Sequence, residues 1–513
     1  MKKFLQERKR IITILAPLMI GIIYLALCLV CLRHSASTAE AYNAYLVRFD
    51  FGGIWNLSAT GTEPPLYLFL LKIWAHVFGH ADFVLRILST MLGALAILTA
   101  YLWIKYKFGV TAAISSTFLL AIAPFFVRAG QEIGSFTLVI LIIIAASFVL
   151  ELALNTKNKI CWVLYVLLVA AGLWTSYYCG LAWLAHVAYL AISFGKKAPY
   201  KQIALSFLAA AILWLPWAPS AINQINTPQA AGNNDLSLVS VANVATETLV
   251  YTRADELRNS ALVFCLVTVV MILLFVIGQR KKMPQLVSMI AVPFVGLLLL
   301  SLLPCIGFDF WSISFVGAAS VLAMGVAWTA FARKRPVQKR QRKSVKHEKA
   351  CAVLATGTGL IMIVTSACGL SSVYAHEGYD LRLNKKHSAD ILYENIVDFD
   401  FNQYLPIVVK SSDLYYELST YTTEKNPVTF VEAELKQNYG SLQPLRQSYF
   451  GKISNWEKFL AEHDAFWLVD VEPDDSAWLD FSYDGWQATT RSDLRFSDDG
   501  EMYQILKLEK EQI

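Results

Sequence analysis

Long apolar runs separated by short polar segments fill roughly the first three quarters of the chain. The first run, IITILAPLMIGIIYLALCLVCL, covers residues 11–32 and is too long for the core of a signal peptide, so we expect a retained membrane span. A span needs about 20 apolar residues, and on that basis the runs predict about eleven transmembrane helices. The weakest two lie around residues 161–174 and 179–194.

The last part of the chain has a different pattern. LPIVVK, PVTFVEA, AFWLVDVEP and EMYQILKLEK are typical of strands, and SSDLYYELSTYT and ISNWEKFLAEHD are typical of helices. Their alternation favours a small sheet with helices on one side. We therefore expect a mainly α, polytopic membrane domain over residues 1–373, with a first outer loop at 33–83, and a C-terminal α/β domain over 374–513.

Composition and charge support this division. The 513 residues are 56% hydrophobic and only 16% charged, which excludes an ordinary water-soluble protein. Residues 1–373 contain 31 Lys and Arg against 13 Asp and Glu, whereas residues 374–513 contain 13 against 26. The chain therefore combines an embedded part with an acidic, aqueous part.

Basic residues in the short loops predict the orientation. MKKFLQERKR at the N-terminus and the basic stretch at 333–349 are the strongest cytoplasmic signals. They place the N-terminus in the cytoplasm and the C-terminal domain outside. We interpret 333–349 as an orientation signal and expect no nucleic-acid partner.

Cysteine and histidine residues give no sign of a bound group. The eight cysteines lie within or beside apolar runs, the histidines are dispersed, and no CxxC or GxGxxG motif stands out. The sequence predicts no cofactor and leaves a requirement for a divalent cation open.

Acidic residues of the embedded part lie mostly on the predicted outer side. Ionised groups at span ends are costly unless they are paired or functional, so we expect chemistry on that face. A transporter or flippase would instead favour ionisable residues near the bilayer midplane and repeated halves, and the sequence shows few of the former and none of the latter.

One outer segment, GTEPPLYLFLLKIW at 61–74, is too short for a span. Pro64 and Pro65 favour a helix start, and the residues after them form an apolar, aromatic helix suited to the membrane surface. Taken alone, the two prolines also fit a helix break in a loop.

The order of features resembles the C-type glycosyltransferases of the aminoarabinose transferase and protein O-mannosyltransferase kind, in particular the bacterial RgtA/B/C/D-like sugar transferases. The resemblance covers roughly residues 10–225. It rests on a series of segments in the same order: STAEAYNAYLVR, EPPLYLFLLKIWAHVFG, ADFVLRILSTMLGALAILTAYL, APFFVRAGQE, LWTSYYCGL and LWLPWAP.

The resemblance implies an integral membrane enzyme that moves a sugar from a polyprenyl-phosphate donor to an envelope glycan, lipid or protein. A carboxylate would act as the base, and cationic or hydrogen-bonding groups would hold the phosphate. Glu40 is the first candidate for the base and Asp50 the second. The implied substrate-binding residues are Glu63, Arg86, Arg128, Gln131, Glu132, Tyr177 and Tyr178.

Plain structural roles compete with several of these assignments. Arg86 also fits an anchor that reaches the interface, Glu132 fits a solvated loop acid, and the two tyrosines fit an interfacial belt.

The sequence also departs from the family pattern. Ala39-Glu40 stands where the family has an Asp-Glu pair, Gly134 replaces an arginine, and Ser176 replaces a histidine. These losses favour one alternative, a catalytically degenerate member of the same fold that serves as a scaffold or partner in envelope assembly.

Overall fold

The computed structural model describes residues 2–30, 32, 36–225, 242, 246–247, 283–302, 311–332, 344–375, 379–380, 385–386, 392–393, 396, 405–420, 426–432, 435, 443–447, 451–473, 483–495 and 501–511. These residues form two compact units. Unit 1 comprises Met1–Leu32, Glu63–Tyr67 and Arg86–Ala375, and unit 2 comprises Arg33–Thr62, Leu68–Leu85 and His376–Ile513.

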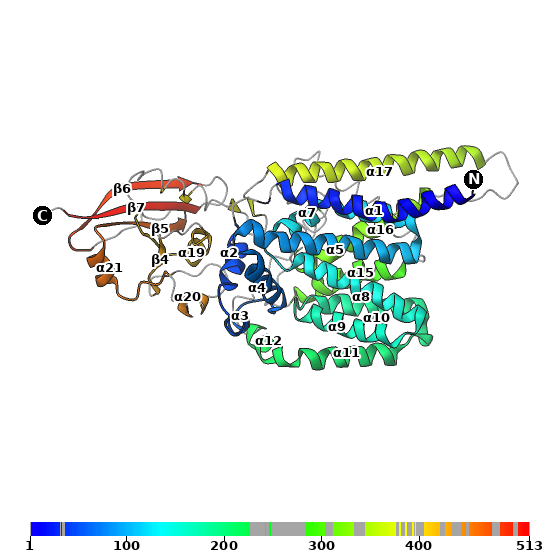
Figure 1. Cartoon of the computed structure of the whole chain (residues 1–513), viewed down its shortest axis with the longest axis horizontal. Helices are drawn as coiled ribbons and strands as arrows, with labels where there is room; N and C mark the ends of the chain where they lie inside the picture. Colours follow the sequence, from blue (N-terminus) through cyan, green and yellow to red (C-terminus); the bar gives the residue numbers. More distant parts are fainter. Residues whose placement is uncertain are drawn as a thin grey trace. The chain divides into compact units, whose positions relative to one another are not determined.

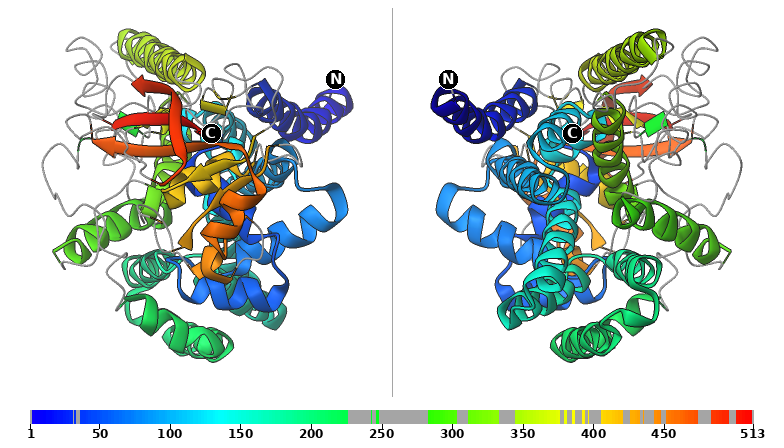
Figure 2. Two further views of the ribbon diagram at one scale, coloured as in Figure 1. Left: turned by 90° about the vertical axis from the view of Figure 1, so that its left-hand side faces the viewer. Right: turned by 90° about the vertical axis from the view of Figure 1, so that its right-hand side faces the viewer.

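Unit 1 is a bundle of helices, several of which run side by side in Figure 1 and are seen close to end on in Figure 2. Its helices are α1 (Lys2–Val30), most of α5 (Asp82–Phe108), α6 (Val110–Ala121), α7 (Pro124–Gln131), α8 (Phe136–Thr156), α9 (Lys159–Leu173), α10 (Cys179–Phe194), α11 (Tyr200–Trp214), α12 (Ala218–Ile225), α15 (Pro284–Leu300), α16 (Ser314–Ala332) and α17 (Ser344–Ala375), with short 3-10 turns at Gly195–Lys197, Leu215–Trp217 and Trp311–Ile313.

The described residues include six helices that are long and apolar enough to cross a membrane. The pair α6 and α7 makes a seventh if it is counted as one span, although its two helices are bent by 60°. Four shorter apolar helices, α9 and α15 among them, have 10–17 residues. The protein is thus a multi-pass membrane protein. The count of about eleven spans stays a prediction, and its part at 226–282 lies largely outside the described residues.

Tyr24 of α1 fixes the packing of three helices in unit 1. Its side chain is fully buried, and its hydroxyl lies where a Cβ atom would stand on either Gly93 of α5 or Gly130 of α7. Glycine at both positions lets the two helices approach the tyrosine ring. This contact holds α7, which is buried along its whole length, against α1.

A polar network joins α5, α8, α10 and α15. The Lys107 Nζ lies 2.6 Å from Glu151 Oε2 and 3.2 Å from both the Tyr189 hydroxyl and Gln285 Oε1. The Tyr189 hydroxyl also donates to Glu151 Oε2 at 2.9 Å, and Asn155 Nδ2 donates to Glu151 Oε1 at 3.2 Å. The buried charges are therefore paired and hydrogen-bonded, as an apolar surrounding requires.

Unit 2 contains a sheet of five described strands in the order β4-β3-β5-β7-β6. The strands are β3 (Ile407–Val409), β4 (Val428–Phe430), β5 (Ala465–Pro473), β6 (Trp486–Arg495) and β7 (Glu501–Lys510), and a separate two-stranded ribbon joins β1 (Tyr379–Asp380) to β2 (Lys385–Lys386). β3 is parallel to β4 and β5, while β7 is antiparallel to β5 and β6. Strands β3, β4, β5 and β7 confirm the four expected from the sequence.

The core of this sheet is covered on one face by α21 (Trp456–Glu462), which Figures 1 and 2 show beside the strands. Phe459 and Leu460 of the helix pack against Phe466 of β5 and Leu506 and Leu508 of β7. Alternate residues of each strand face the same side, so the apolar positions at every second residue form this layer. A further short helix is α20 (Gln443–Gln447).

Most of the loop at 33–83, which the sequence predicts to be outer, also belongs to unit 2, and Glu63–Tyr67 belongs to unit 1. The loop forms α2 (Thr38–Leu46) and α3 (Phe51–Ala59), and most of α4 (Leu66–Phe78) follows. Lys72 Nζ of α4 donates to the Val47 carbonyl at 2.8 Å, and Trp74 Nε1 donates to the Val84 carbonyl at 2.8 Å. Helix α2 packs on α19 (Ser412–Leu418) of the C-terminal domain.

Candidate active site

The Pro64-Pro65 segment leads into a helix, as the sequence predicts. Helix α4 begins at Leu66, both prolines are buried, and the Leu66 amide donates to the Trp174 carbonyl at 3.1 Å. Glu63, just before them, is exposed and accepts a hydrogen bond from the Ser135 hydroxyl at 3.2 Å. The segment is therefore attached to both the α7–α8 and the α9–α10 connections.

Tyr177 lies in the α9–α10 connection and is held by two polar partners. The Trp217 Nε1 donates to its hydroxyl at 2.8 Å, and the hydroxyl donates to Gln224 Oε1 of α12. Burial raises the pKa of Tyr177 to about 12, and the negative charge of Glu63 adds to the increase. The phenol stays protonated at neutral pH. Tyr178, the next residue, is half-buried and is the N-cap residue of α10.

Helix α7 carries a buried ion pair. Pro124 occupies its first turn, where the missing amide hydrogen costs nothing. The Arg128 Nε lies 3.2 Å from Glu132 Oε1, and the side chains are 7% and 2% exposed. Glu132 is thus buried and paired with Arg128, which excludes the reading of a solvated loop acid.

Arg86 and Gln131 bind backbone carbonyls near the C-terminal end of α1. The Arg86 Nη1 donates to the Leu32 carbonyl at 2.9 Å, and the Gln131 Nε2 donates to the Cys28 carbonyl at 3.2 Å. Arg86 is 1% exposed, so it is no snorkelling anchor. Thr90, one turn further along α5, donates to the Gly130 carbonyl at 2.6 Å and connects α5 to α7.

The predicted substrate-binding residues all lie in unit 1. Direct contacts join Arg128 to Glu132, Ser135 connects Glu63 to the start of α8, and Glu63 influences the pKa of Tyr177. The printed geometry thus gives an ion pair at the end of α7, an acid and a phenol near the start of α8, and two side chains that bind backbone carbonyls near the end of α1. Such a set can bind an anionic headgroup and orient hydroxyl groups.

The two candidate bases lie in unit 2 and make helix caps. Glu40 is 1% exposed and closes a capping box on α2: its Oε2 accepts from the Ser37 amide at 3.1 Å, and the Ser37 hydroxyl accepts from the Glu40 amide. Asp50 is exposed and accepts from the Gly53 amide at 2.7 Å at the start of α3. Their catalytic roles stay predictions.

Sequence reasoning did not identify Ser135, Trp217 and Gln224 as parts of the site. Trp217 lies in LWLPWAP, one of the segments that carry the family resemblance, so that segment could have identified it. Ser135 and Gln224 carry no local signal, because only the packing of α8 and α12 brings them to Glu63 and Tyr177.

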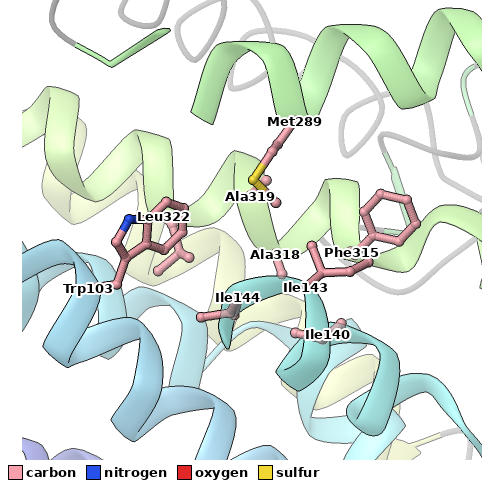
Figure 3. Close-up of a pocket in the computed structure, with 9 residues that line it drawn as sticks. All are labelled: Trp103, Ile140, Ile143, Ile144, Met289, Phe315, Ala318, Ala319 and Leu322. Atoms are coloured by element: carbon pink, nitrogen blue, oxygen red, sulfur yellow. The ribbon is translucent and has the colours of Figure 1, made fainter. Parts of the chain in front are cut away.

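Neither a metal site nor a ligand-sized cavity is found among the described residues. No group of three or more His, Cys, Asp or Glu side chains in this part of the chain is placed to hold a metal ion. A small cavity in unit 1 lies between Trp103, Met289 and Phe315, with Ile140, Ile143, Ile144, Ala318, Ala319 and Leu322 completing its wall (Figure 3). Its volume of about 10 Å³ barely admits one water molecule, so it is a packing void.

Comparisons with known proteins bear on these residues. Residues 62–217 match the family described as dolichyl-phosphate-mannose-protein mannosyltransferase. No curated protein matches the chain by sequence.

Solved structures share the fold. ArnT from Cupriavidus metallidurans bound to undecaprenyl phosphate matches with a TM-score of 0.55 at 11% identity, covering 97% of both chains. Its apo state matches with a TM-score of 0.52 at 12% identity, covering 98% of both. The Archaeoglobus fulgidus oligosaccharyltransferase tethered with an acceptor peptide containing the NVT sequon matches with a TM-score of 0.50 at 14% identity. The match covers 80% of this chain and 63% of the archaeal one.

The family match begins one residue before Glu63 and ends at Trp217, and so encloses every residue of the unit 1 site except Gln224. The protein is therefore a multi-pass membrane protein with the GT-C glycosyltransferase fold, and its residues 62–217 carry the sequence pattern of the dolichyl-phosphate-mannose-protein mannosyltransferase family.

Proposed function

We propose that the protein transfers a sugar from a polyprenyl-phosphate donor to an envelope acceptor on the outer face of the cytoplasmic membrane. The family match over residues 62–217 carries this proposal, because it covers Glu63, Arg86, Arg128, Glu132 and Tyr177. The fold shared with ArnT, whose structure contains undecaprenyl phosphate, supports a lipid-linked donor. The acceptor is a glycan, lipid or protein of the envelope.

The proposed reaction forms a bond between the acceptor oxygen and the anomeric carbon and breaks the bond from that carbon to the phosphate oxygen. The acceptor hydroxyl gives its proton to Glu40, and the polyprenyl monophosphate leaves with the bonding electron pair. Positive charge develops on the sugar in the transition state, and a nearby carboxylate stabilises it. Phosphate is a good leaving group, so the step demands no general acid.

The unit 1 residues supply binding in this proposal. Arg86 and Arg128 favour the anionic phosphate, since guanidinium groups bind phosphate oxygens with strong hydrogen bonds. Glu63, Gln131, Glu132, Tyr177 and Tyr178 orient the sugar or the acceptor. The apolar face of α4, which follows Pro65, lies along the membrane surface beside the prenyl chain.

The orientation belongs to the same proposal. The N-terminus is cytoplasmic in this proposal, and the C-terminal domain and the loop that contains Glu40 are on the outer side; the basic residues of MKKFLQERKR and of the loop at 333–349 support it. A lipid-linked donor presents its headgroup at this membrane edge.

One observation favours a second candidate, a catalytically degenerate scaffold in envelope assembly. The Glu40 carboxylate serves a structural purpose in the capping box, and Ala39 beside it offers no carboxylate. A protein of this kind would keep the fold and lack transfer.

The capping box makes a sharp test available. Glu40→Gln keeps an oxygen that accepts the Ser37 amide hydrogen, because Gln also closes capping boxes, and removes the basic carboxylate. In nanodiscs supplied with polyprenyl-phosphate sugars and acceptor, we expect turnover to fall by about 100-fold or more, with donor affinity changed far less. Ser37→Ala is the matched control: it weakens the cap by roughly 1 kcal/mol and leaves the base in place.

Two further variants separate the candidates. Asp50→Asn should reduce turnover less than Glu40→Gln, and a dead Asp50→Asn beside an active Glu40→Gln would reassign the base. Ala39→Asp rebuilds the family's acidic pair and should maintain or raise activity. A wild type that transfers no sugar, together with an active Ala39→Asp variant, would establish the scaffold in place of the enzyme.

A further inference from the structure

A carboxylate from the C-terminal domain lies on the first turn of α2. The Thr38 hydroxyl donates to Glu417 Oε1, although the two residues are 379 positions apart. Both side chains are buried, with Thr38 at 4% and Glu417 at 8% exposure. Glu40 and Glu417 therefore both bind the turn formed by residues 37–40, one through the Ser37 amide and the other through Thr38.

Further contacts fasten α2 to α19 along its length. Tyr42 and Tyr45 of α2 meet Tyr416 edge to face, with ring centroids 5.1 Å and 5.4 Å apart. At the end of α2, the Arg48 Nη2 donates to the Ser419 carbonyl at 3.4 Å. The helix that carries Glu40 is thus held at its start, middle and end by a single element of the C-terminal domain.

Helix α19 is itself anchored in the sheet. Its Tyr415 ring packs against Phe430 of β4 at 4.7 Å, and the helix contacts β3 directly. It is buried throughout, apart from Asp413 at its start. The sheet therefore fixes the place of Glu417, and Glu417 in turn restrains the first turn of α2.

We propose that Glu417 is a positioning residue that replaces the carboxylate missing at Ala39. The inference rests on the proposed transferase function. With Ala39 in place of an acid, the turn carries one carboxylate of its own, and Glu417 brings a second to the adjacent residue from the far end of the chain. The amino end of α2 favours negative charge from both. The C-terminal domain then acts on the transfer step through the turn that carries Glu40, because it supplies the second carboxylate bound to that turn.

A rescue experiment distinguishes this role from plain structural support. Glu417→Gln keeps an acceptor for the Thr38 hydroxyl and removes the charge, and we expect kcat to fall about tenfold with the donor KM unchanged. Ala39→Asp places a carboxylate in the turn itself, so adding Glu417→Gln to that variant should change kcat less than about twofold. A structural contribution of Glu417 would reduce kcat equally in both backgrounds. Glu432→Gln, a half-exposed acid of the same domain, is the matched control and should have no effect.

A second pair of variants covers the case in which Glu417→Gln does not fold. Thr38→Val loses the hydroxyl and should lower kcat by a similar factor, whereas Thr38→Ser keeps the hydroxyl and should restore it. Normal turnover of Glu417→Gln in an active protein, or a loss that Ala39→Asp leaves unchanged, overturns this inference and leaves the transferase function intact. Absence of transfer in the wild type and in Ala39→Asp overturns the proposed function and this inference together.

Discussion

Breaking the ion pair between Lys107 and Glu151 is expected to destabilise unit 1 strongly. Glu151→Gln keeps the size and a hydrogen-bonding oxygen but leaves the ammonium group without its counter-charge. Removing one partner of a buried pair costs about 3–5 kcal/mol. In the variant, the Lys107 Nζ still has the Tyr189 hydroxyl and Gln285 Oε1 at 3.2 Å, and the lysine side chain is 15% exposed. We therefore expect a loss of unfolding free energy at the lower end of this range, about 3 kcal/mol.

The double variant tests the reasoning more strictly than the single one. Lys107→Met combined with Glu151→Gln removes both charges, and replacement of a whole buried pair is often close to neutral. We therefore expect it to be more stable than Glu151→Gln alone by about 2 kcal/mol. Lys105→Met is the control: that lysine lies over the Tyr101 ring at 5.9 Å, a contact that contributes about 1 kcal/mol or less.

Reversible unfolding in mixed detergent micelles measures these free energies, with the loss of α-helical circular dichroism as the signal. A Glu151→Gln variant within about 1 kcal/mol of the wild type would show that the pair is solvated and contributes little. A double variant less stable than either single variant would show that packing of the two side chains matters more than their charges.

Three more outcomes follow from the structure. Gly130→Ala should destabilise unit 1 by about 1–3 kcal/mol, because the new methyl group meets the Tyr24 hydroxyl. Adding Tyr24→Phe should recover part of that loss in the same unfolding assay. If the losses of stability of the two single variants simply add in the double variant, the contact is contradicted. Between pH 10 and 12 the wild type should lose stability that Tyr177→Phe keeps. The reason is that the Tyr177 phenol ionises near pH 10 in the unfolded chain but holds its proton to about pH 12 in the folded protein. If the unfolding free energies of the two proteins fall equally with pH over this range, the raised pKa of Tyr177 is disproved. In a background without native cysteines, Glu63→Cys and Gln487→Cys should react with an impermeant maleimide in intact cells, and labelling that requires permeabilisation would reverse the orientation.

Local patterns were sufficient for much of the fold. Apolar runs predicted the membrane helices, and Pro64 and Pro65 predicted the start of α4 to within one residue. Four strands followed from dense β-branched and aromatic residues. Strand β6 was missed because Trp486 is its one buried large side chain in the described part, and the half-buried positions after it are Ala488, Thr490 and Ser492. An edge strand with small, half-buried residues resembles a polar loop in sequence.

The candidate site was less predictable, because its chemistry depends on contacts between distant residues. The sequence placed Arg128 and Glu132 four residues apart, and the helical spacing made their ion pair foreseeable. Nothing around Ser135 or Gln224 indicated partners 72 and 47 positions away. The contact of Glu417 was the hardest to predict from the sequence, since its partner Thr38 is 379 positions away.

The order of strands in unit 2 has a consequence for how the protein is made. Strand β7 follows both β5 and β6 in the chain, yet it lies between them in the sheet. Helix α2 is separated from its partner α19 by the helices from α5 to α17. Contacts of such long sequence separation form slowly, and partly synthesised chains expose the surfaces that await them. A chain truncated before β7 lacks the strand that joins β5 to β6, so its sheet is incomplete.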